Sequence, residues 1–595
     1  MDATDRSLQV ELFVDVLRQL NHSVPDENFP AVFTLLDAEK SKPNRFRRFA
    51  RDKRISFPEF THHIKAELRD FKLADKEIAK IANATGVAPG DYEGSNAKEK
   101  ITVVINELVK IVEAKVSEFN IAEAIPAFIT NVDSLTHEFE AEEARTENSL
   151  DQEVDYVREI ESGKRKSDYL HVLHEHQYLI EKVVQLQPSG DGLLTQDAMS
   201  QLLALVERLL HLYTVSDHIH YDIFPSTLQI SHDFIARAQH VEDIGERMEE
   251  WGKEQAQIKL GMIGTDDRIS IGVDMATYMS ELDEAFRIDL GFSFNDLIAL
   301  PIMLYSWAHD DEAAEHTFYS ATVDEIASAC EKGIEGFDLS TISKILDFLT
   351  LHPDKVLMLE GAAEPTNDLP VWEHRKRSNR YGLRPLIMIG DRYYWGPHSV
   401  ERSSKIWASM TNTHKLPSDI QAPEVAKLLD RFHEKYRIAL QTKIAEIVRR
   451  FTSLIETEVS PSSRGFSDED IGDIDVFALT PDRKILLNIE SKVIDQAFSN
   501  KDINRVSQKI FGRTTSKGEF EKGYLQRVEA RAEFLKVSDK QLAESTWGRV
   551  AEDVRVVSIF VTPNSFWWTK FPPVKTDVNF VELSLLEDFI RSLKS

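Results

Sequence analysis

The chain has 595 residues, 42% hydrophobic and 29% charged, so it is long enough for two to four domains with separate cores. Its formal net charge of −29 argues weakly against nucleic acid as a partner of the whole surface. Cys330 is the single cysteine, which excludes a disulfide framework. The first ten residues lack the order of a secretory signal, so we expect a cytoplasmic protein.

Charge is distributed unevenly along the chain. Residues 374–595 contain 36 Lys and Arg against 30 Asp and Glu, a net charge of +6. Residues 1–373 contain 35 basic against 70 acidic residues, a net charge of −35. An acidic front and a mildly basic back predict two different tasks in one chain.

The front of the chain is predicted to be a large all-α N-terminal region, because apolar residues recur at helical spacing through most of it. We divide it into a helical region, 1–115, and an acidic helical region, 116–364. The most apolar window, Gly291–His309, contains Asp296 and Pro301, so we interpret it as a buried helix and expect no membrane partner.

Six histidines in the acidic helical region invite a metal interpretation. His171 and His174 would share a helical face, but neither cysteines nor an HExxH pattern accompanies them. We therefore favour solvent-facing or core histidines. The six are His171, His174, His176, His211, His218 and His220.

Residues 365–421 interrupt the helical rhythm with prolines and glycines, and we expect a linker and a β-hairpin subdomain there. Arg384–Pro397 has the pattern of a hairpin that turns at Gly390-Asp391. Its aromatic strand follows a basic run, Arg375, Lys376 and Arg377. The pair could bind nucleic acid by stacking and phosphate contact, or be an ordinary packed hairpin.

The last domain, 422–595, is predicted to begin with one long amphipathic helix from Pro423 to about Thr457. A hairpin follows within residues 474–489, then a helix over Val493–Gly512 and another over Lys517–Leu535. Two buried strands, Val554–Val561 and Asn579–Leu583, precede a closing helix.

The hairpin places two carboxylates side by side. If the turn is centred between Asp482 and Arg483, paired positions sum to 965, so Asp475 falls opposite Glu490. Strand alternation then returns Lys492 to the same face. Two like charges at that distance oppose folding unless something compensates them, and Mg²⁺ is suited to do so. This set of residues is typical of metal-assisted phosphodiester hydrolysis.

The order helix, strand, hairpin, helix, strand, with Asp475 and then Glu490-Ser491-Lys492, resembles the PD-(D/E)XK nuclease superfamily. The resemblance covers roughly Pro423–Leu583, about a quarter of the chain. The Gly472-Asp473-Ile474-Asp475 approach is similar to the GEID type, with Asp473 where Glu is usual. The proline of the family name is absent before Asp475.

The resemblance implies a restriction-endonuclease-like α/β domain with a central mixed β-sheet flanked by helices. Asp475 and Glu490 would then bind Mg²⁺ or Mn²⁺, and Lys492 would position the attacking water. Many members add a glutamate from the preceding helix, which is matched by Glu446 or, less well, by Glu456. Either Gln508 or Lys509 would match the polar residue of the following helix.

The implied function is metal-dependent cleavage of DNA. Arg505, Lys509 and Arg513 would contact the phosphate backbone, which positions a substrate without reading its sequence. The acidic front would bind a protein partner, hold a homo-oligomer together or gate the nuclease. Such a layout resembles effectors of bacterial defence or restriction. The alternative is a catalytically inactive nuclease-like domain in a helical protein-interaction scaffold.

Overall fold

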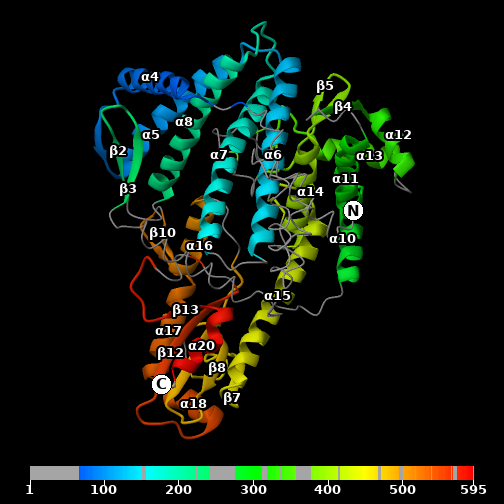
Figure 1. Cartoon of the computed structure of the whole chain (residues 1–595). Coiled ribbons are helices and arrows are strands. Elements are labelled where there is room, and N and C mark those ends of the chain that lie inside the picture. The colour runs from blue at the N-terminus through cyan, green and yellow to red at the C-terminus, as the bar shows by residue number, and fades with distance from the viewer. Residues whose placement is uncertain are drawn as a thin grey trace, which may run out of the picture.

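The computed structural model describes residues 64, 66–150, 156–221, 226–240, 275–310, 318–333, 338–356, 371, 377–412, 416–417, 419–466, 471–494, 500–515, 517–537, 539–563, 566 and 572–593. Predictions for residues 1–63, and for Arg375 and Lys376, lie outside this part of the chain. The described residues form three regions with separate cores (Figure 1), and a few residues between Leu351 and Ile387 return to the first core.

The first core is built from long helices and one small sheet. The helices are α4 (Leu68–Thr85), α5 (Gly94–Val116), α6 (Ile121–Leu150), α7 (Tyr156–Leu186) and α8 (Gln196–Tyr221). The antiparallel strands are β1 (Gly90–Tyr92), β2 (Ser226–Ile230) and β3 (Ala236–His240). The prediction of an all-α front is therefore wrong for this part. Leu228, Ile230 and Ala236 are buried against the helices. They lie on one face of a short β-hairpin, where alternate residues are buried, so the helical spacing of the front did not apply to them.

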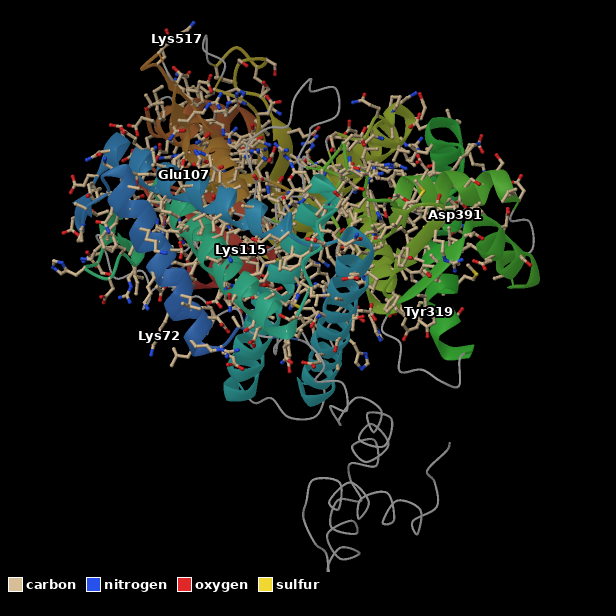
Figure 2. All side chains as sticks on the ribbon, turned by 90° about the horizontal axis from the view of Figure 1, so that it is seen from above. Lys72, Glu107, Lys115, Tyr319, Asp391 and Lys517 are labelled. Atoms are coloured by element: carbon tan, nitrogen blue, oxygen red, sulfur yellow. The ribbon has the colours of Figure 1, made fainter. Side chains whose placement is uncertain are left out.

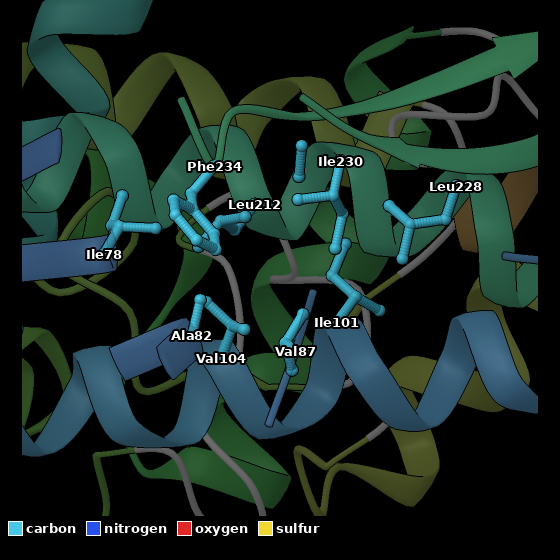
Figure 3. Close-up of a pocket in the computed structure, with 10 residues that line it drawn as sticks. Ile78, Ala82, Val87, Ile101, Val104, Leu212, Leu228, Ile230 and Phe234 are labelled. Atoms are coloured by element: carbon cyan, nitrogen blue, oxygen red, sulfur yellow. The ribbon is translucent and has the colours of Figure 1, made fainter. Parts of the chain in front are cut away.

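The β2–β3 hairpin, α4, α5 and α8 enclose a small apolar cavity of about 20 Å³ (Figure 3). Side chains that line it include Ile78, Val104, Leu212, Ile230 and Phe234. That volume holds about one water-sized sphere, and a wholly apolar lining offers water no partner. We interpret this cavity as a packing gap.

The second core combines helices with a three-stranded sheet. The helices are α10 (Met275–Leu290), α11 (Phe294–Asp310), α12 (Val323–Gly333), α13 (Leu339–Leu349) and α14 (Pro397–Asn412). The strands are β4 (Tyr319–Thr322), β5 (Ile387–Ile389) and β6 (Arg392–Trp395), in the order β4-β6-β5. In Figure 2, Tyr319 and Asp391 lie over this core, across the molecule from Lys72, Glu107 and Lys115 of the first.

The predicted hairpin that turns at Gly390-Asp391 is confirmed as β5–β6. It is a packed hairpin, because Trp395 is completely buried and donates its indole N–H to the Leu304 carbonyl at 3.2 Å. Among the described residues no single helix could cross a membrane, although one bent pair, Ala276–Leu290 with Phe294–Ser306, has suitable length and composition.

One helix, α15 (Pro423–Arg449), passes from the second core into the third (Figure 1). Its first half, up to Phe432, packs among residues of the second core. Its second half, from Leu440 to Val448, packs under the C-terminal sheet. The cores thus divide the described chain differently from the predicted ranges. Buried residues between Ala74 and Ala236 share the first core with Val371, Tyr381 and Ile387, whereas Leu383, Leu386 and the buried residues of α14 belong to the second core.

The third region is an α/β domain with a five-stranded mixed sheet in the order β13-β12-β9-β8-β7. β12 runs parallel to β9 and β13, whereas β7, β8 and β9 are antiparallel. The strands are β7 (Leu454–Val459), β8 (Ile474–Leu479), β9 (Ile485–Ser491), β12 (Arg555–Thr562) and β13 (Asn579–Glu582).

Helices cover both faces of this sheet. On one face lie α15 and α20 (Leu586–Ser592), the latter after a 3-10 turn, Leu583–Leu585. On the other lie α16 (Asn500–Phe511), α17 (Tyr524–Val537) and α18 (Asp539–Trp547), with a short ribbon of β10 (Arg513–Thr514) and β11 (Phe520–Glu521). The prediction of a mixed sheet flanked by helices is confirmed.

Three helix boundaries differ from the prediction. The helix expected from Val493 is described from Asn500, and Val493 and Ile494 lie outside any helix. The helix expected to reach Thr457 ends at Arg449, and Leu454–Val459 forms the edge strand β7. Thr452 donates its hydroxyl to the Leu479 carbonyl at 2.6 Å, which turns the chain onto the sheet. The helix expected from Lys517 begins at Tyr524, because Phe520 and Glu521 pair with β10.

A buried ion pair joins α7 to the loop before β5. Glu181 and Arg380 meet at 2.9 Å with their side chains 4% and 1% exposed, and Glu181 also accepts from the Tyr381 N–H at 2.9 Å. Glu181→Ala removes the carboxylate from a buried guanidinium, so we expect unfolding to become easier by about 3–5 kcal/mol. Thermal unfolding measures this.

The matched control is Glu107→Ala, which removes an exposed ion pair with Lys110 on α5. Its cost should stay below about 1 kcal/mol. Equal losses for the two variants would contradict the role given to Glu181.

Candidate active site

The β8–β9 hairpin has the predicted register. Val476 pairs with Ile489 and Leu479 with Leu486, and both sums are 965. Asp475 and Glu490 therefore stand at opposed positions at the end of the ladder. Phe477 and Leu486 belong to the core under α17 and α18, so strand alternation puts both carboxylates on that face of the sheet.

The Asp475 side chain continues the hydrogen bonding between the two strands beyond the end of the ladder. Its Oδ2 accepts a hydrogen bond from the Ser491 N–H at 2.7 Å and from the Ser491 hydroxyl at 2.9 Å. From the other face, Gln441 of α15 donates to the Asp475 carbonyl at 2.9 Å. Asp475 is only 8% exposed, with its carboxylate bound by Ser491 and its backbone carbonyl bound by Gln441, which together fix the position of the residue.

Two cations enclose Glu490, which is 5% exposed. Lys492 Nζ lies 2.6 Å from Glu490 Oε1 and 3.6 Å from Asp475 Oδ2. Arg531 of α17 binds Glu490 Oε2 and donates to the Asp473 carbonyl. The Lys492 ammonium also lies 5.3 Å from the centre of the Tyr524 ring.

Gly472 allows the chain to pass close to Arg531. Its φ of 78° is in the left-handed region, and a Cβ there would lie 3.3 Å from Arg531 Nη1. The predicted glycine-acid approach thus has a structural role: it brings the Asp473 carbonyl to a buried guanidinium.

The cluster is formally neutral, because Asp475 and Glu490 are matched by Lys492 and Arg531. This corrects the expectation that the carboxylate pair is destabilising without a metal ion. Sequence reasoning placed Lys492 there but missed Arg531, which comes from a helix 41 residues beyond Glu490. The one signal in the sequence was that Arg531 lies four residues after Arg527 in a predicted helix, which does not indicate burial beside Glu490.

The donor set still fits Mg²⁺ or Mn²⁺. Both side chains offer hard carboxylate oxygens, which these ions prefer, with water completing the shell. Within the described part of the chain, Asp475 Oδ1 makes no hydrogen bond, and Glu490 Oε1 contacts Lys492 alone. Asp475 and Glu490 could therefore share an ion once the Lys492 ammonium moves away from Glu490.

Glu446 is not brought to this cluster. Its side chain is exposed on α15, and no contact joins it to Asp475, Glu490 or Lys492. Arg437, one turn before Gln441, is the charged α15 residue near Asp475. Hydrogen bonds from Arg437 to Glu434, with the negative charges of Glu434, Asp475 and Glu458, raise its pKa.

The edge strand β7 supplies a carboxylate that sequence reasoning missed. Thr457 pairs with Val476 and Val459 with Ile474, so Glu458 lies opposite Asp475. Its φ of 53° is rare for a residue other than glycine, and such strain gathers at functional sites. The predicted alternative, Glu456, is on the same strand but forms an ion pair with Arg464 at 2.6 Å.

The predicted nucleic-acid contacts fall into different settings. Lys509 is exposed on α16, where Arg505 and Gln508 are half-buried. Gln508 donates to Asn504 at 3.0 Å, and exposed Arg513 pairs with Glu521 at 2.6 Å.

Arg377 is wrong as a surface contact, because it is only 7% exposed. A basic run gives charge but not burial, and the fold turns this arginine inward.

Comparisons with protein-family models, curated proteins and solved structures found no match. The case for a function is therefore made by the arrangement of Asp475, Glu490 and Lys492.

Arg531→Met tests the compensation of Glu490. The substitution keeps most of the buried volume but leaves the carboxylate with Lys492 alone, so we expect a loss of about 3 kcal/mol in unfolding free energy. Chemical denaturation measures it.

Arg527→Met, on the exposed side of α17, is the control and should change stability by less than about 0.5 kcal/mol. A stable Arg531→Met protein would mean that Glu490 does not need this guanidinium.

Proposed function

We propose that the C-terminal α/β domain is a metal-dependent nuclease of the PD-(D/E)XK type that hydrolyses phosphodiester bonds of DNA. The observation that carries this proposal is the placement of Asp475, Glu490 and Lys492 on one face, at the end of two central strands. The mixed sheet with a long helix before the hairpin is consistent with it.

Each side chain has a separate task. Asp475 and Glu490 would hold Mg²⁺ or Mn²⁺, which when bound offsets negative charge on the phosphate and makes water more acidic. Lys492, released from Glu490, donates hydrogen bonds to the attacking water or to a phosphate oxygen. Arg531 fixes Glu490, and Gln441 fixes the strand that carries Asp475.

Glu458 is proposed as the third carboxylate in place of Glu446. It lies opposite Asp475 in the strand register, and the negative charges of both residues contribute to the raised pKa of Arg437. Its exposure on an edge strand lets it meet a substrate or a second ion.

The acidic front is proposed to bind a partner, to hold an oligomer together or to gate the nuclease. Helix α16, which carries Lys509, packs against α8 of the first core (Figure 1). The front therefore touches the helix proposed to meet the DNA backbone. We place the protein in the cytoplasm, with effectors of bacterial defence or restriction.

The second candidate function is a nuclease-like domain that docks without cleaving. The neutral cluster favours it, because Lys492 and Arg531 already compensate both carboxylates. The two candidates differ in whether the intact protein needs a divalent ion to act.

Incubation of the full-length protein with supercoiled plasmid, linear duplex or single strands, with Mg²⁺, Mn²⁺ or EDTA, separates them. We expect cleavage that requires the ion and falls at least about 100-fold in Glu490→Gln and Lys492→Met. Gel analysis of the products measures it.

Glu533→Gln, an exposed carboxylate on α17, is the control and should cleave like the wild type. If no substrate is cleaved and calorimetry detects no binding of either ion, the nuclease proposal fails and the docking function stands.

Paired variants identify the third carboxylate. We expect Glu458→Ala to lower the rate about 10-fold or more, because a group opposite Asp475 is lost, and Glu446→Ala to leave it unchanged. Initial rates at saturating Mg²⁺ measure this. The opposite result would restore the carboxylate of the helix to the site.

A further inference from the structure

Three side chains that can bind a metal ion lie close together between α7 and α8, in the first core and distant in sequence from the β8–β9 hairpin. His171 and Glu175 are four residues apart on α7, so they share one helix face, and Glu207 comes from α8. Candidate ligand atoms of the three lie within 4.8 Å of one another. His171 Nε2 is 3.8 Å from Glu175 Oε1.

Glu175 is the unusual member of this group. Its side chain is 3% exposed, and its Oε1 has no hydrogen-bond partner in the part of the chain that the structure describes. Buried carboxylate oxygens in folded proteins nearly always have a partner. Burial, with the negative charge of Glu207, raises the pKa of Glu175 well above its ordinary value.

The arginine beside this group is already engaged elsewhere. Arg208 lies 3.6 Å from Glu207 Oε1, but it donates two hydrogen bonds to Asp75, at 2.7 and 3.2 Å. Another group of three, Glu140, His398 and Glu401, differs in this respect. There Lys405 contacts both carboxylates at 3.0 Å and supplies the positive charge.

We propose that His171, Glu175 and Glu207 bind a divalent transition-metal ion, for which Zn²⁺ fits best. One imidazole with two carboxylates is a donor set that Zn²⁺ accepts, whereas Mg²⁺ and Ca²⁺ prefer oxygen alone. In a tetrahedral zinc site, ligand atoms are about 3.4 Å apart. The 3.8 Å between His171 and Glu175 therefore needs to close by a few tenths of an ångström, and Glu207, whose oxygen lies within 4.8 Å of both, needs to approach by up to about 1.4 Å.

The site is accessible and can hold a fourth ligand. The His171 side chain is 50% exposed, which gives the ion a path from solvent and leaves a position for water. Bound there, the ion ties α7 to α8 and gives Glu175 Oε1 its partner. This proposal does not depend on the nuclease proposal, because it concerns a different core and a different metal.

Zinc binding to the full-length protein, after chelation and dialysis, tests the site by calorimetry. We expect the wild type to bind one Zn²⁺ equivalent that Glu175→Gln and His171→Ala lose, with an affinity drop of about 100-fold or more. His174→Ala, a neighbouring histidine of α7 outside the group, should bind like the wild type.

Thermal unfolding is a second measurement, and it shows whether a variant that loses zinc binding is still folded. Glu175→Gln keeps the shape of the side chain and removes the buried charge, so without metal it should melt at or above the wild-type temperature. Added Zn²⁺ should raise the melting temperature of the wild type only.

Equal zinc binding by the wild type and Glu175→Gln, or none by the wild type, would overturn the proposal. If one bound Zn²⁺ equivalent is retained in Glu175→Gln but lost in His398→Ala, the ion binds at the group of Glu140, His398 and Glu401. That result would also overturn the proposal.

Discussion

Helix α15 belongs to two hydrophobic cores at once. Val425 and Phe432 are buried among helices of the second core, and Ile444 and Val448 are buried under the C-terminal sheet. A continuous helix of 27 residues is a rod of about 40 Å, so its two ends cannot choose their orientations independently. The sheet is therefore held in a fixed orientation relative to the second core. Gln441, within the segment of α15 buried under the sheet, donates a hydrogen bond to the strand that carries Asp475.

The electrostatics of the candidate site follow from that rigid placement. Glu490 is bound by Lys492, which directly follows its strand, and by Arg531 from a helix that covers the sheet. Because the charges cancel within the chain, the domain can fold before any ion arrives. If the site binds an ion as proposed, that ion would compete with the Lys492 ammonium for Glu490, and the proposed activity would depend on the position of the Lys492 side chain. The same reasoning distinguishes the α7–α8 group, where no lysine or arginine among the described residues forms an ion pair with Glu175, and its Oε1 has no hydrogen-bond partner there.

Local pattern was sufficient to place the hairpin, its register and the pairing of Asp475 with Glu490, because alternation and a turn are written in neighbouring residues. It also located β12, β13 and the closing helix. It failed at Leu454–Val459, where Ile455 continues the helical spacing of Ile447 and Val448 and only pairing with β8 makes a strand. Arg531 and Glu458 were missed for a related reason: their roles depend on residues that only the fold brings close to them. Arg377 was predicted at the surface because a basic run shows charge but does not show burial.

The parallel pairing of β9 with β12 also bears on the order in which the domain is made. β9 ends at Ser491, and its parallel neighbour begins at Arg555, so the hairpin leaves the ribosome with one edge uncovered. Parallel neighbours require a long crossover, and contacts far apart in sequence form slowly. Arg531 itself is within that crossover. During synthesis the acidic pair exists before its second cation does, which keeps the site incomplete until α17 has been made.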